Sequence, residues 1–261
     1  MSDKNIQSLG DRMKCYEAST SSMLEKNVPV IIRVDGKAFH SYLKKIESFN
    51  ECVNDVMDKV AVALCENIQG AQVAYVQSDE VSVFVHSYKN ENSSSWFNNQ
   101  QQKMCSVAAA IAAATFTAES WKIWTKITPG LNDIRPAYFD ARAFTLPEHE
   151  VCNYFIWRQK DAIRNSVQTL ARTKFSHKKV DGKNQLEMKE MCRAVGSDWD
   201  ELPASLQHGR AVYRVLDEKE LGVIRSRWHV DKVIPLFTTD RDFIDRFLKR
   251  NEENDECEAR S

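Results

Sequence analysis

Residues 71–85 of this chain read AQVAYVQSDEVSVFV, and this stretch decides the fold. Two runs rich in β-branched and aromatic residues flank the polar residues 77–80, which is the pattern of a β-hairpin. Apolar residues over 53–64 recur with the helical period, so a helix precedes the hairpin. Further upstream, a short β-branched run over 30–34 follows a proline and predicts a buried strand that stops at Asp35.

The residues after the hairpin complete a known order of elements. We expect a helix from about 100 to 125, ended by a Pro-Gly pair, and a strand over 137–146. Strand, helix, strand, strand, helix, strand is the ferredoxin-like βαββαβ arrangement of polymerase palms and nucleotide cyclases. The predicted fold is therefore α+β, a palm-like domain with a packed, mainly helical C-terminal extension.

The expected organisation has four parts, whose boundaries follow the predicted elements and the composition. The extension contains helices at 150–173, 184–195 and 240–249, with a short strand at 211–216. The last residues are acidic and polar, so we expect disorder there. The parts are an N-terminal helical segment at 1–27, the palm at 28–147, the extension at 148–250 and the tail at 251–261.

Composition narrows the class of protein. The net charge is −1, so any contact with nucleic acid must come from local basic patches. Seven scattered cysteines without a CxxC pair favour free thiols in a reducing compartment, and we expect a cytoplasmic protein. The longest apolar run, 107–116, is far too short to span a bilayer.

Two carboxylates stand where the predicted palm would bring strand ends together. Asp35 ends the first strand and Asp79 lies in the hairpin turn, with Glu80 beside it in a supporting role. First and third strands are neighbours in this fold, so both acids converge at one edge and the Gly36 carbonyl can join them. Mg²⁺ prefers such oxygen ligands. The alternative is that these are ordinary turn residues.

Several separated motifs, in order, resemble the tRNA(His) guanylyltransferase family over about residues 9–216. They include RVDGKAFH at 33–40, YVQSDE at 75–80, YFDAR at 138–142 and NYFIWRQ at 153–159. The opening LGDRMK and the later FSHK, Gly-Lys and Glu-Met pairs resemble the guanylyltransferase-like branch, whose members are 3′-to-5′ polymerases.

The resemblance implies two Mg²⁺ ions, homotetramers, GTP or ATP as substrates, and activation of a tRNA 5′ end followed by nucleotide addition. It also implies a set of site residues, all numbered in this sequence. Metal ligands would be Asp35, Gly36 and Asp79, with Glu80 among the catalytic acids; the nucleotide would contact Gly36, Lys37, Ala38, Phe39, His40, Ser78, Lys103 and Ser106.

One departure bears on specificity. Guanylyltransferases proper carry a His-Ile-Asn-Asn-Leu-Tyr-Asn motif after the Arg-Gln pair, where this chain reads IRNSVQT at 163–169. The missing histidine favours templated repair of truncated tRNA 5′ ends over non-templated G addition to histidine tRNA.

Contacts with RNA are predicted along the helix at 150–173 and the basic stretch after it. The alternative for each is a solvated face or loop, since lysine and arginine bind phosphate without sequence information. The tryptophans, Trp157 among them, are expected in the core. The predicted RNA-binding residues are Arg158, Asn165, Arg172, Lys174, His177 and Lys178.

Three other functions remain open from the sequence. Non-templated G addition is one, a palm-type nucleotide cyclase is the second, and a catalytically silent RNA-binding protein is the third. A cyclase would need neither a basic RNA surface nor the extension, and a silent protein would not need both Asp35 and Asp79. The leading prediction is a template-dependent 3′-to-5′ nucleotidyltransferase that acts on tRNA.

Overall fold

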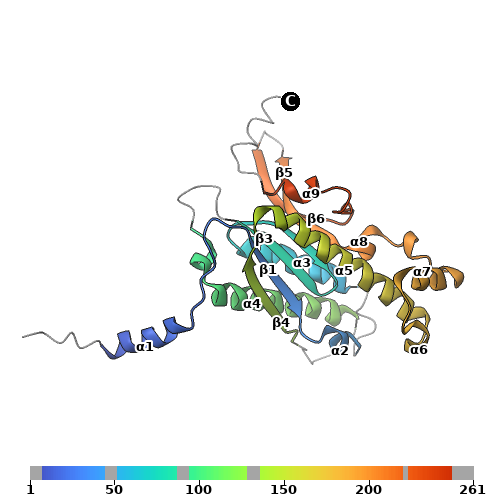
Figure 1. Cartoon of the computed structure of the whole chain (residues 1–261), viewed down its shortest axis with the longest axis horizontal. Coiled ribbons are helices and arrows are strands. Elements are labelled where there is room, and N and C mark those ends of the chain that lie inside the picture. Colours follow the sequence, from blue (N-terminus) through green and yellow to red (C-terminus); the bar gives the residue numbers. More distant parts are fainter. Residues whose placement is uncertain (1–7, 45–51, 87–93, 128–135, 220–222, 249–261) are drawn as a thin grey trace, which may run out of the picture.

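The structure is a computed structural model that describes residues 8–44, 52–86, 94–127, 136–219 and 223–248 (Figure 1). The chain contains both helices and strands. In order they are α1 (Leu9–Ser19), β1 (Val30–Gly36), α2 (Phe39–Lys44), α3 (Val53–Asn67), β2 (Ala71–Gln77), β3 (Glu80–Val85), η2 (Trp96–Asn99), α4 (Gln101–Ile127), β4 (Phe139–Thr145), α5 (Glu148–Lys174), α6 (His177–Val180), α7 (Gln185–Ala194), η3 (Trp199–Glu201), α8 (Ala204–His208), β5 (Arg210–Lys219), β6 (Val223–Asp231) and α9 (Asp242–Asp245).

These strands form one antiparallel sheet in the order β4-β1-β3-β2-β5-β6. The first four strands and the helices between them confirm the predicted βαββαβ palm. Asp35 on β1 lies opposite Glu80 on β3 and opposite Asp140 on β4. Since directly opposed residues point to the same face of a sheet, the three acids stand side by side at one end of the strands.

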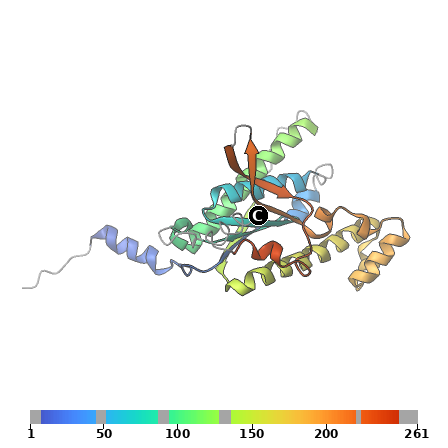
Figure 2. The ribbon, with the colours of Figure 1, turned by 90° about the horizontal axis from the view of Figure 1, so that it is seen from above.

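Helices cover both faces of the sheet, as Figures 1 and 2 show. Alternation along β1 explains this: Val30, Ile32 and Val34 pack in the cluster with α3 and α4, whereas Ile31 packs in the cluster with α5. Every residue of β3 is buried, which accounts for its almost continuous apolar sequence. Full burial of one Val or Ile side chain stabilises the fold by roughly 1.5–3 kcal/mol.

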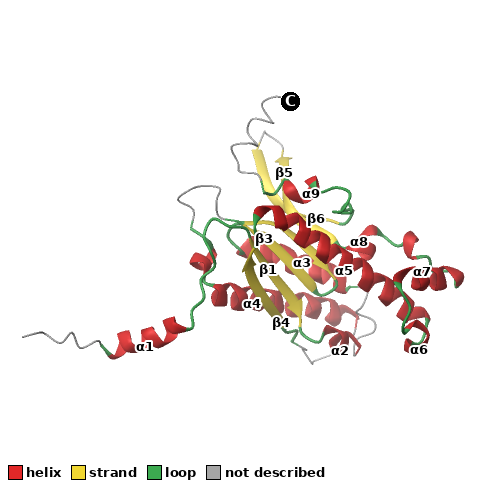
Figure 3. Cartoon of the chain, in the orientation of Figure 1, coloured by secondary structure: helices red, strands yellow, loops and turns green. Residues whose placement is uncertain are grey.

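The extension is mainly helical, as predicted, and the expected strand at 211–216 lies within β5. Helix α5 is present, but β5 and β6 continue the palm sheet at its β2 edge, and β6 was missed (Figure 3). Its sequence, VIRSRWHVD, carries charged residues at several positions because β6 is an edge strand and residues 225–227 are all exposed. The expected helix at 240–249 is a single turn, α9, and the expected tail lies outside the described residues.

Within the predicted N-terminal helical segment 1–27, the helix α1 ends at Ser19, and none of its residues is buried. Both views show α1 projecting away from the rest of the chain. The segment after it is fixed to the start of α4, where Gln101 N–H donates to the Ser22 carbonyl at 3.0 Å.

At the other end of the molecule, the second half of α5 extends past the sheet and forms a small core with α6, α7 and η3. Val167 and Ala171 of α5 pack there with Met188, Cys192 and Trp199. None of the helices in the described ranges is long and apolar enough to cross a membrane.

Candidate active site

Two turns meet at one end of the sheet. The Gly36 N–H at the end of β1 donates to the Asp79 carbonyl of the β2–β3 turn at 3.1 Å. Next to these residues, Ala38 and Ser78 have left-handed backbones, with φ of 55° and 47°. For a residue with a side chain this conformation costs roughly 1–2 kcal/mol. Such strain persists only where the surrounding structure enforces it, and it clusters at functional sites.

The carboxylates at these turns repel one another. Burial first, and then the charges of Asp79, Glu80 and Asp140, together raise the pKa of Asp35 to about 6. Burial also raises the pKa of Asp79, while the hydrogen bond from the Ser78 hydroxyl, at 2.9 Å, opposes the rise. We call Asp35, Asp79, Glu80 and Asp140 the carboxylate edge. A cation at this edge would offset the repulsion.

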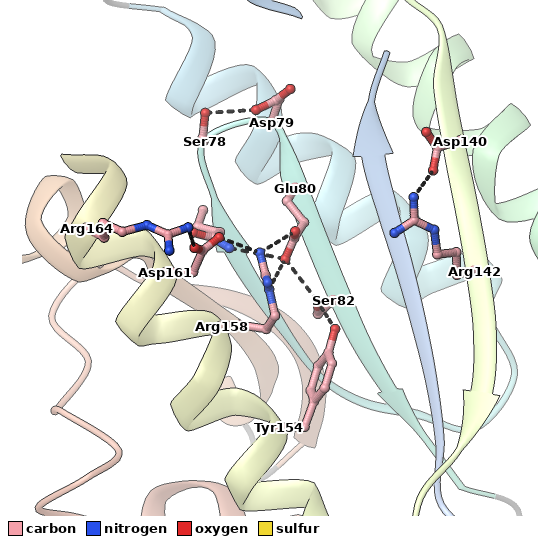
Figure 4. A network of polar contacts seen from close by, with 11 residues as sticks. Ser78, Asp79, Glu80, Ser82, Asp140, Arg142, Tyr154, Arg158, Asp161 and Arg164 are labelled. Carbon is pink, nitrogen blue, oxygen red and sulfur yellow. Dashed lines mark hydrogen bonds and ion pairs between the residues drawn. The ribbon is translucent and has the colours of Figure 1, made fainter. Parts of the chain in front are cut away.

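Glu80 already has a cation as its partner (Figure 4). Its two oxygens accept from Arg158, from Nε at 2.8 Å and from Nη2 at 2.7 Å, and one also accepts from the Gln77 amide at 3.2 Å. Both side chains of this ion pair are about nine-tenths buried. Glu80 therefore fits a supporting role that fixes the turn, because its oxygens are taken up by Arg158.

The prediction that Arg158 contacts RNA was wrong. Arg158 is 6% exposed, and its guanidinium donates hydrogen bonds to Glu80 and Asp161. Its neighbour Trp157, expected in the core, is instead 54% exposed, and Arg158 lies over its ring at 4.4 Å. Arg158 is therefore buried and its neighbour Trp157 is exposed, which is the reverse of what the two residue types alone suggest.

The predicted nucleotide loop follows Gly36 directly. A Cβ at Gly36 would come within 2.3 Å of the Phe39 ring, so this approach of the chain requires glycine. Phe39 itself is buried against Phe116 and Phe139, so a nucleotide can meet only its backbone. Lys37 and Ala38 are exposed beside the carboxylate edge, whereas the side chain of His40 lies outside what the structure describes.

Lys103 and Ser106 lie away from the carboxylate edge within one chain, so their contact with the nucleotide stays a prediction. Gln101, at the start of α4, donates to the Ala143 carbonyl in β4, well away from the carboxylate edge. The part of α4 near the edge is Phe116, which packs on Phe39. With a rise of about 1.5 Å per residue, Lys103 and Ser106 lie roughly 15–20 Å back along the helix axis. The sequence placed them near the start of the helix without showing which end faces the site.

Two cavities flank the second half of α5. The first, of about 330 Å³, lies beside the β2–β3 turn and is lined by Ser78, Asn165 and Arg210 among others; we call it the turn cavity. The second, of about 150 Å³, is lined by Arg172, His177 and Lys183 among others; we call it the basic cavity.

Most of the predicted RNA-binding residues lie at or near these cavities. Asn165 lines the turn cavity, and Arg172 and His177 line the basic cavity. Lys174 and Lys178 are exposed on the same end of the molecule. The structure thus gathers these residues beyond the sheet end and leaves Arg158 out of the group.

The predicted metal ligands fill only part of the coordination shell of a metal ion. In the described ranges no cluster of three or more His, Cys, Asp or Glu side chains is arranged to hold a metal ion. Asp35, Asp79 and the Gly36 carbonyl supply only two carboxylates and one carbonyl. This donor set suits Mg²⁺, which commonly takes one or two protein carboxylates and completes its octahedron with phosphate oxygens and water.

Sequence reasoning missed three residues of this region. Arg210 and Gln77 are buried walls of the turn cavity, and Lys183 completes the basic cavity. Arg210 is held by ion pairing with Asp58 of α3, a contact between residues 152 positions apart. Nothing local in the sequence signals that contact, whereas Lys183 lies beside a glycine in a basic loop and was within reach of a motif argument.

A family model and known sequences both match this chain. A family model described as Thg1, tRNAHis guanylyltransferase, matches residues 10–147. The tRNA(His) guanylyltransferase 1 of Arabidopsis thaliana is 27% identical over 76% of this chain and 36% of its own length.

Two solved bacterial structures cover more of the chain. A bacterial tRNA(His) guanylyltransferase (Thg1)-like protein in complex with ATP is 35% identical, covers 93% of this chain and 99% of its own, and superposes with a TM-score of 0.82. The bacterial Thg1-like protein in complex with GTP is 35% identical, covers 92% and 98%, and gives a TM-score of 0.77.

Proposed function

The chain belongs to the Thg1 family of tRNAHis guanylyltransferases, which are nucleotidyltransferases, and from this premise we propose that it extends tRNA 5′ ends in the 3′-to-5′ direction, guided by a template. The observation that carries the proposal is the meeting of Asp35 with the Asp79 turn through the Gly36 hydrogen bond. The bacterial Thg1-like structures, solved with ATP and with GTP, support nucleoside triphosphates as substrates.

Asp35, Asp79 and the Gly36 carbonyl would hold the two Mg²⁺ ions of the proposal. Such ions neutralise phosphate charge and align the attacking and leaving oxygens. The chain's own residues would position the reactants: residues 36–38 and the Ser78 hydroxyl would face the triphosphate. The Arg158–Glu80 pair keeps the turn that carries Asp79 in place.

The tRNA would approach along the second half of α5. The basic cavity, with Arg172, His177 and Lys183, supplies donors for backbone phosphates. Lys174 and Lys178 extend this basic surface, and Asn165 stands between it and the catalytic turn. A homotetramer in the cytoplasm completes the proposal, by analogy with the family.

Template dependence is supported by the α5 sequence. At the position of the family's motif histidine the chain has Ile163, which packs with the apolar cluster of Val167 and Trp199. This position therefore offers no imidazole for a histidine-tRNA-specific step. Non-templated G addition is the competing outcome of the same test.

The decisive experiment supplies Mg²⁺, labelled nucleotides and a tRNA that lacks its first 5′ residue. The opposing base in the 3′ strand is varied among C, U and A. We expect the added nucleotide to follow the opposing base. Addition of G against every base would replace templated repair by non-templated G addition.

Asp79→Ala serves as the control for the metal assignment. We expect it to abolish addition and to leave thermal unfolding close to that of the parent chain, because a turn carboxylate contributes little to the core. Full activity in Asp79→Ala would show that the carboxylate edge is not the catalytic site.

A further inference from the structure

Helix α5 covers only part of the sheet face that carries the carboxylate edge. Directly opposed residues form two polar rows across this face, about 7 Å apart along the strands. From β4 through β1 to β3, the rows are Asp140, Asp35 and Glu80, and then Arg142, Arg33 and Ser82. In both rows the residue on β3 is buried, the one on β1 is half-buried and the one on β4 is exposed. Figure 4 shows α5 beside Glu80 and Ser82 and away from Asp140 and Arg142, so this face stays open over β4.

Trp157 borders the open part of this face. It is 54% exposed, and its ring centroid lies 4.4 Å from the guanidinium carbon of Arg158 and 5.9 Å from that of Arg33. Arg158 in turn donates to Glu80 at 2.7–2.8 Å, so the indole is separated from the carboxylate edge by one side chain. Because tryptophan is usually well buried, an indole exposed at this place indicates a ligand rather than a contribution to the core.

The indole is held in a fixed orientation by its neighbours on α5. Tyr154, about one turn earlier, packs edge-on against it with ring centroids 5.9 Å apart. Tyr154 is itself 7% exposed and shares a hydrogen bond of 2.8 Å with the Ser82 hydroxyl. Arg158 is fixed by its hydrogen bonds to Glu80 and Asp161. A ligand that stacks on this ring would therefore lose little affinity to the ordering of side chains.

The charges around Trp157 favour a nucleotide over an apolar protein segment. In the described part of the chain the Arg33 guanidinium forms no ion pair and donates no hydrogen bond. Arg142 has Asp140 as a partner at 3.7 Å, but both side chains are more than half exposed, so this pair contributes little. A nucleotide offers a π face to the indole and negative charge to the arginines. An apolar segment would desolvate the same arginines without supplying a counter-charge.

We propose that Trp157 is a stacking platform for one nucleobase of the substrate, beside the carboxylate edge. This inference rests on the proposed function and names a residue that positions its substrate. The base belongs either to the 5′ end of the RNA or to a nucleoside triphosphate. Arg172 of the basic cavity is fifteen residues further along α5, about 22 Å, so the platform and the basic cavity contact different parts of one RNA.

The test uses 2-aminopurine, a fluorescent adenine analogue whose emission falls when it stacks on an aromatic ring. One probe is a tRNA that lacks its first residue and carries 2-aminopurine at the new 5′ end, and the other is 2-aminopurine riboside triphosphate. Each probe is titrated alone with the full chain and Mg²⁺, so that no addition takes place. We expect the parent chain to quench at least one probe, and the quenched probe identifies the source of the base. Quenching of neither probe would overturn the proposal.

Trp157→Phe and Trp157→Leu separate stacking from simple apolar contact. Phenylalanine keeps a π face and should retain most of the quenching. Leucine lacks one, so Trp157→Leu should lose the quenching and raise the Kd of that probe about tenfold or more. Tyr16→Leu is the control, because it removes an exposed aromatic ring from α1, which projects away from the sheet, and it should leave the Kd unchanged. Thermal unfolding of all three variants should stay close to that of the parent chain, since both rings are more than half exposed.

The outcomes keep the platform apart from the proposed function and from an interface between copies of the chain. Equal quenching by Trp157→Phe and Trp157→Leu would overturn the platform even where Asp79→Ala abolishes addition. If Asp79→Ala stays active, it is the proposed function that fails, whatever the probes show. Sedimentation compares the mass of the parent chain with that of Trp157→Leu. A smaller assembly in the variant would show that a second copy covers the ring, and that result would also overturn the platform.

Discussion

Arg158 and Arg172 lie on the same helix, but the first is buried and the second is exposed. Arg158, beside the carboxylate edge, is buried and pairs with Glu80 and Asp161. Arg172, fourteen residues later and roughly 20 Å along the axis, is exposed and lines the basic cavity. The difference teaches that what α5 packs against decides whether an arginine serves the fold or a substrate. Where the helix crosses the sheet, Arg158 pairs with buried acids, and beyond the sheet Arg172 is exposed to solvent.

The two regions also differ in what they would bind. At the carboxylate edge the pKa values of Asp35 and Asp79 are raised, so binding of a cation there would be favourable. The basic cavity gathers Arg172, His177 and Lys183, a set of side chains that favours binding of an anion. The net charge of −1 for the whole chain does not reveal this local separation of charge. Catalysis at a phosphate requires both, a metal at one end and an anchored nucleic acid at the other.

The largest expected effect is at the carboxylate edge. Asp35→Asn should lower kcat for nucleotide addition by about a thousandfold or more, the scale of losing a main electrostatic group of a site. It should also stabilise the protein at pH 7, because it removes a half-buried charge among like charges. Discounting for solvent screening, we expect a gain of about 1 kcal/mol in the free energy of unfolding.

The pH dependence follows from the sign of the shift. A raised pKa in the folded state means that the folded protein holds the Asp35 proton more tightly, so this stability is complete below the ordinary value of 3.8 and is lost as pH rises to about 6. The advantage of Asp35→Asn in the free energy of unfolding should therefore vanish near pH 4.

At limiting Mg²⁺, activity of the parent chain should fall as pH drops through about 6. Asp140→Asn, at an exposed neighbour, is the control, and an equal loss of activity there would contradict a special role for Asp35.

The second largest effect is on stability and concerns Arg158. Arg158→Gln leaves the Glu80 carboxylate buried without its cation, and we expect a loss of about 3 kcal/mol in the free energy of unfolding. Chemical denaturation measures it, with Arg164→Gln as the matched control. Arg164 is exposed and also pairs with Asp161, so its loss should cost less than about 1 kcal/mol. Similar costs for both arginines would erase the contrast between buried and exposed charge on α5.

Sequence reasoning succeeded where local pattern decides structure. The 30–34 run, the 71–85 hairpin and the helical period over 53–64 specified the palm, and Asp35 and Asp79 were placed because sheet topology brings the two turns together. It failed where long-range packing decides. The inward turn of Arg158 depends on Glu80, 78 residues earlier, and the distance of Lys103 from the edge depends on which end of α4 meets the sheet end. Strand β6 was not predicted because it is an edge strand with exposed, charged residues at 225–227 and therefore lacks an apolar alternation.

An intermediate effect is expected at Gly36. A methyl group there would clash with the Phe39 ring, and overpacking of this kind costs roughly 1–3 kcal/mol. Gly36→Ala should therefore lower both stability and kcat, since the same residue carries the Asp79 hydrogen bond. Adding Phe39→Leu relieves the clash and should restore part of the lost kcat. If the double variant is no more active than Gly36→Ala, the loop tolerates the methyl group and the contact does not set the turn.

The smallest expected effect lies in the basic cavity and tests the other half of the comparison. Arg172→Gln removes one exposed phosphate contact, so it should weaken tRNA binding several-fold and reduce the slope of log Kd against log salt by about 1. The effect should not depend on the sequence of the tRNA, because phosphate contacts carry no base information. Lys126→Gln, which removes an exposed positive charge in the last turn of α4, is the matched control and should leave the slope unchanged. Because both substitutions change net charge equally, a slope that falls in both would trace binding to the overall field of the protein, and a slope that falls only in Arg172→Gln would locate it at the exposed end of α5.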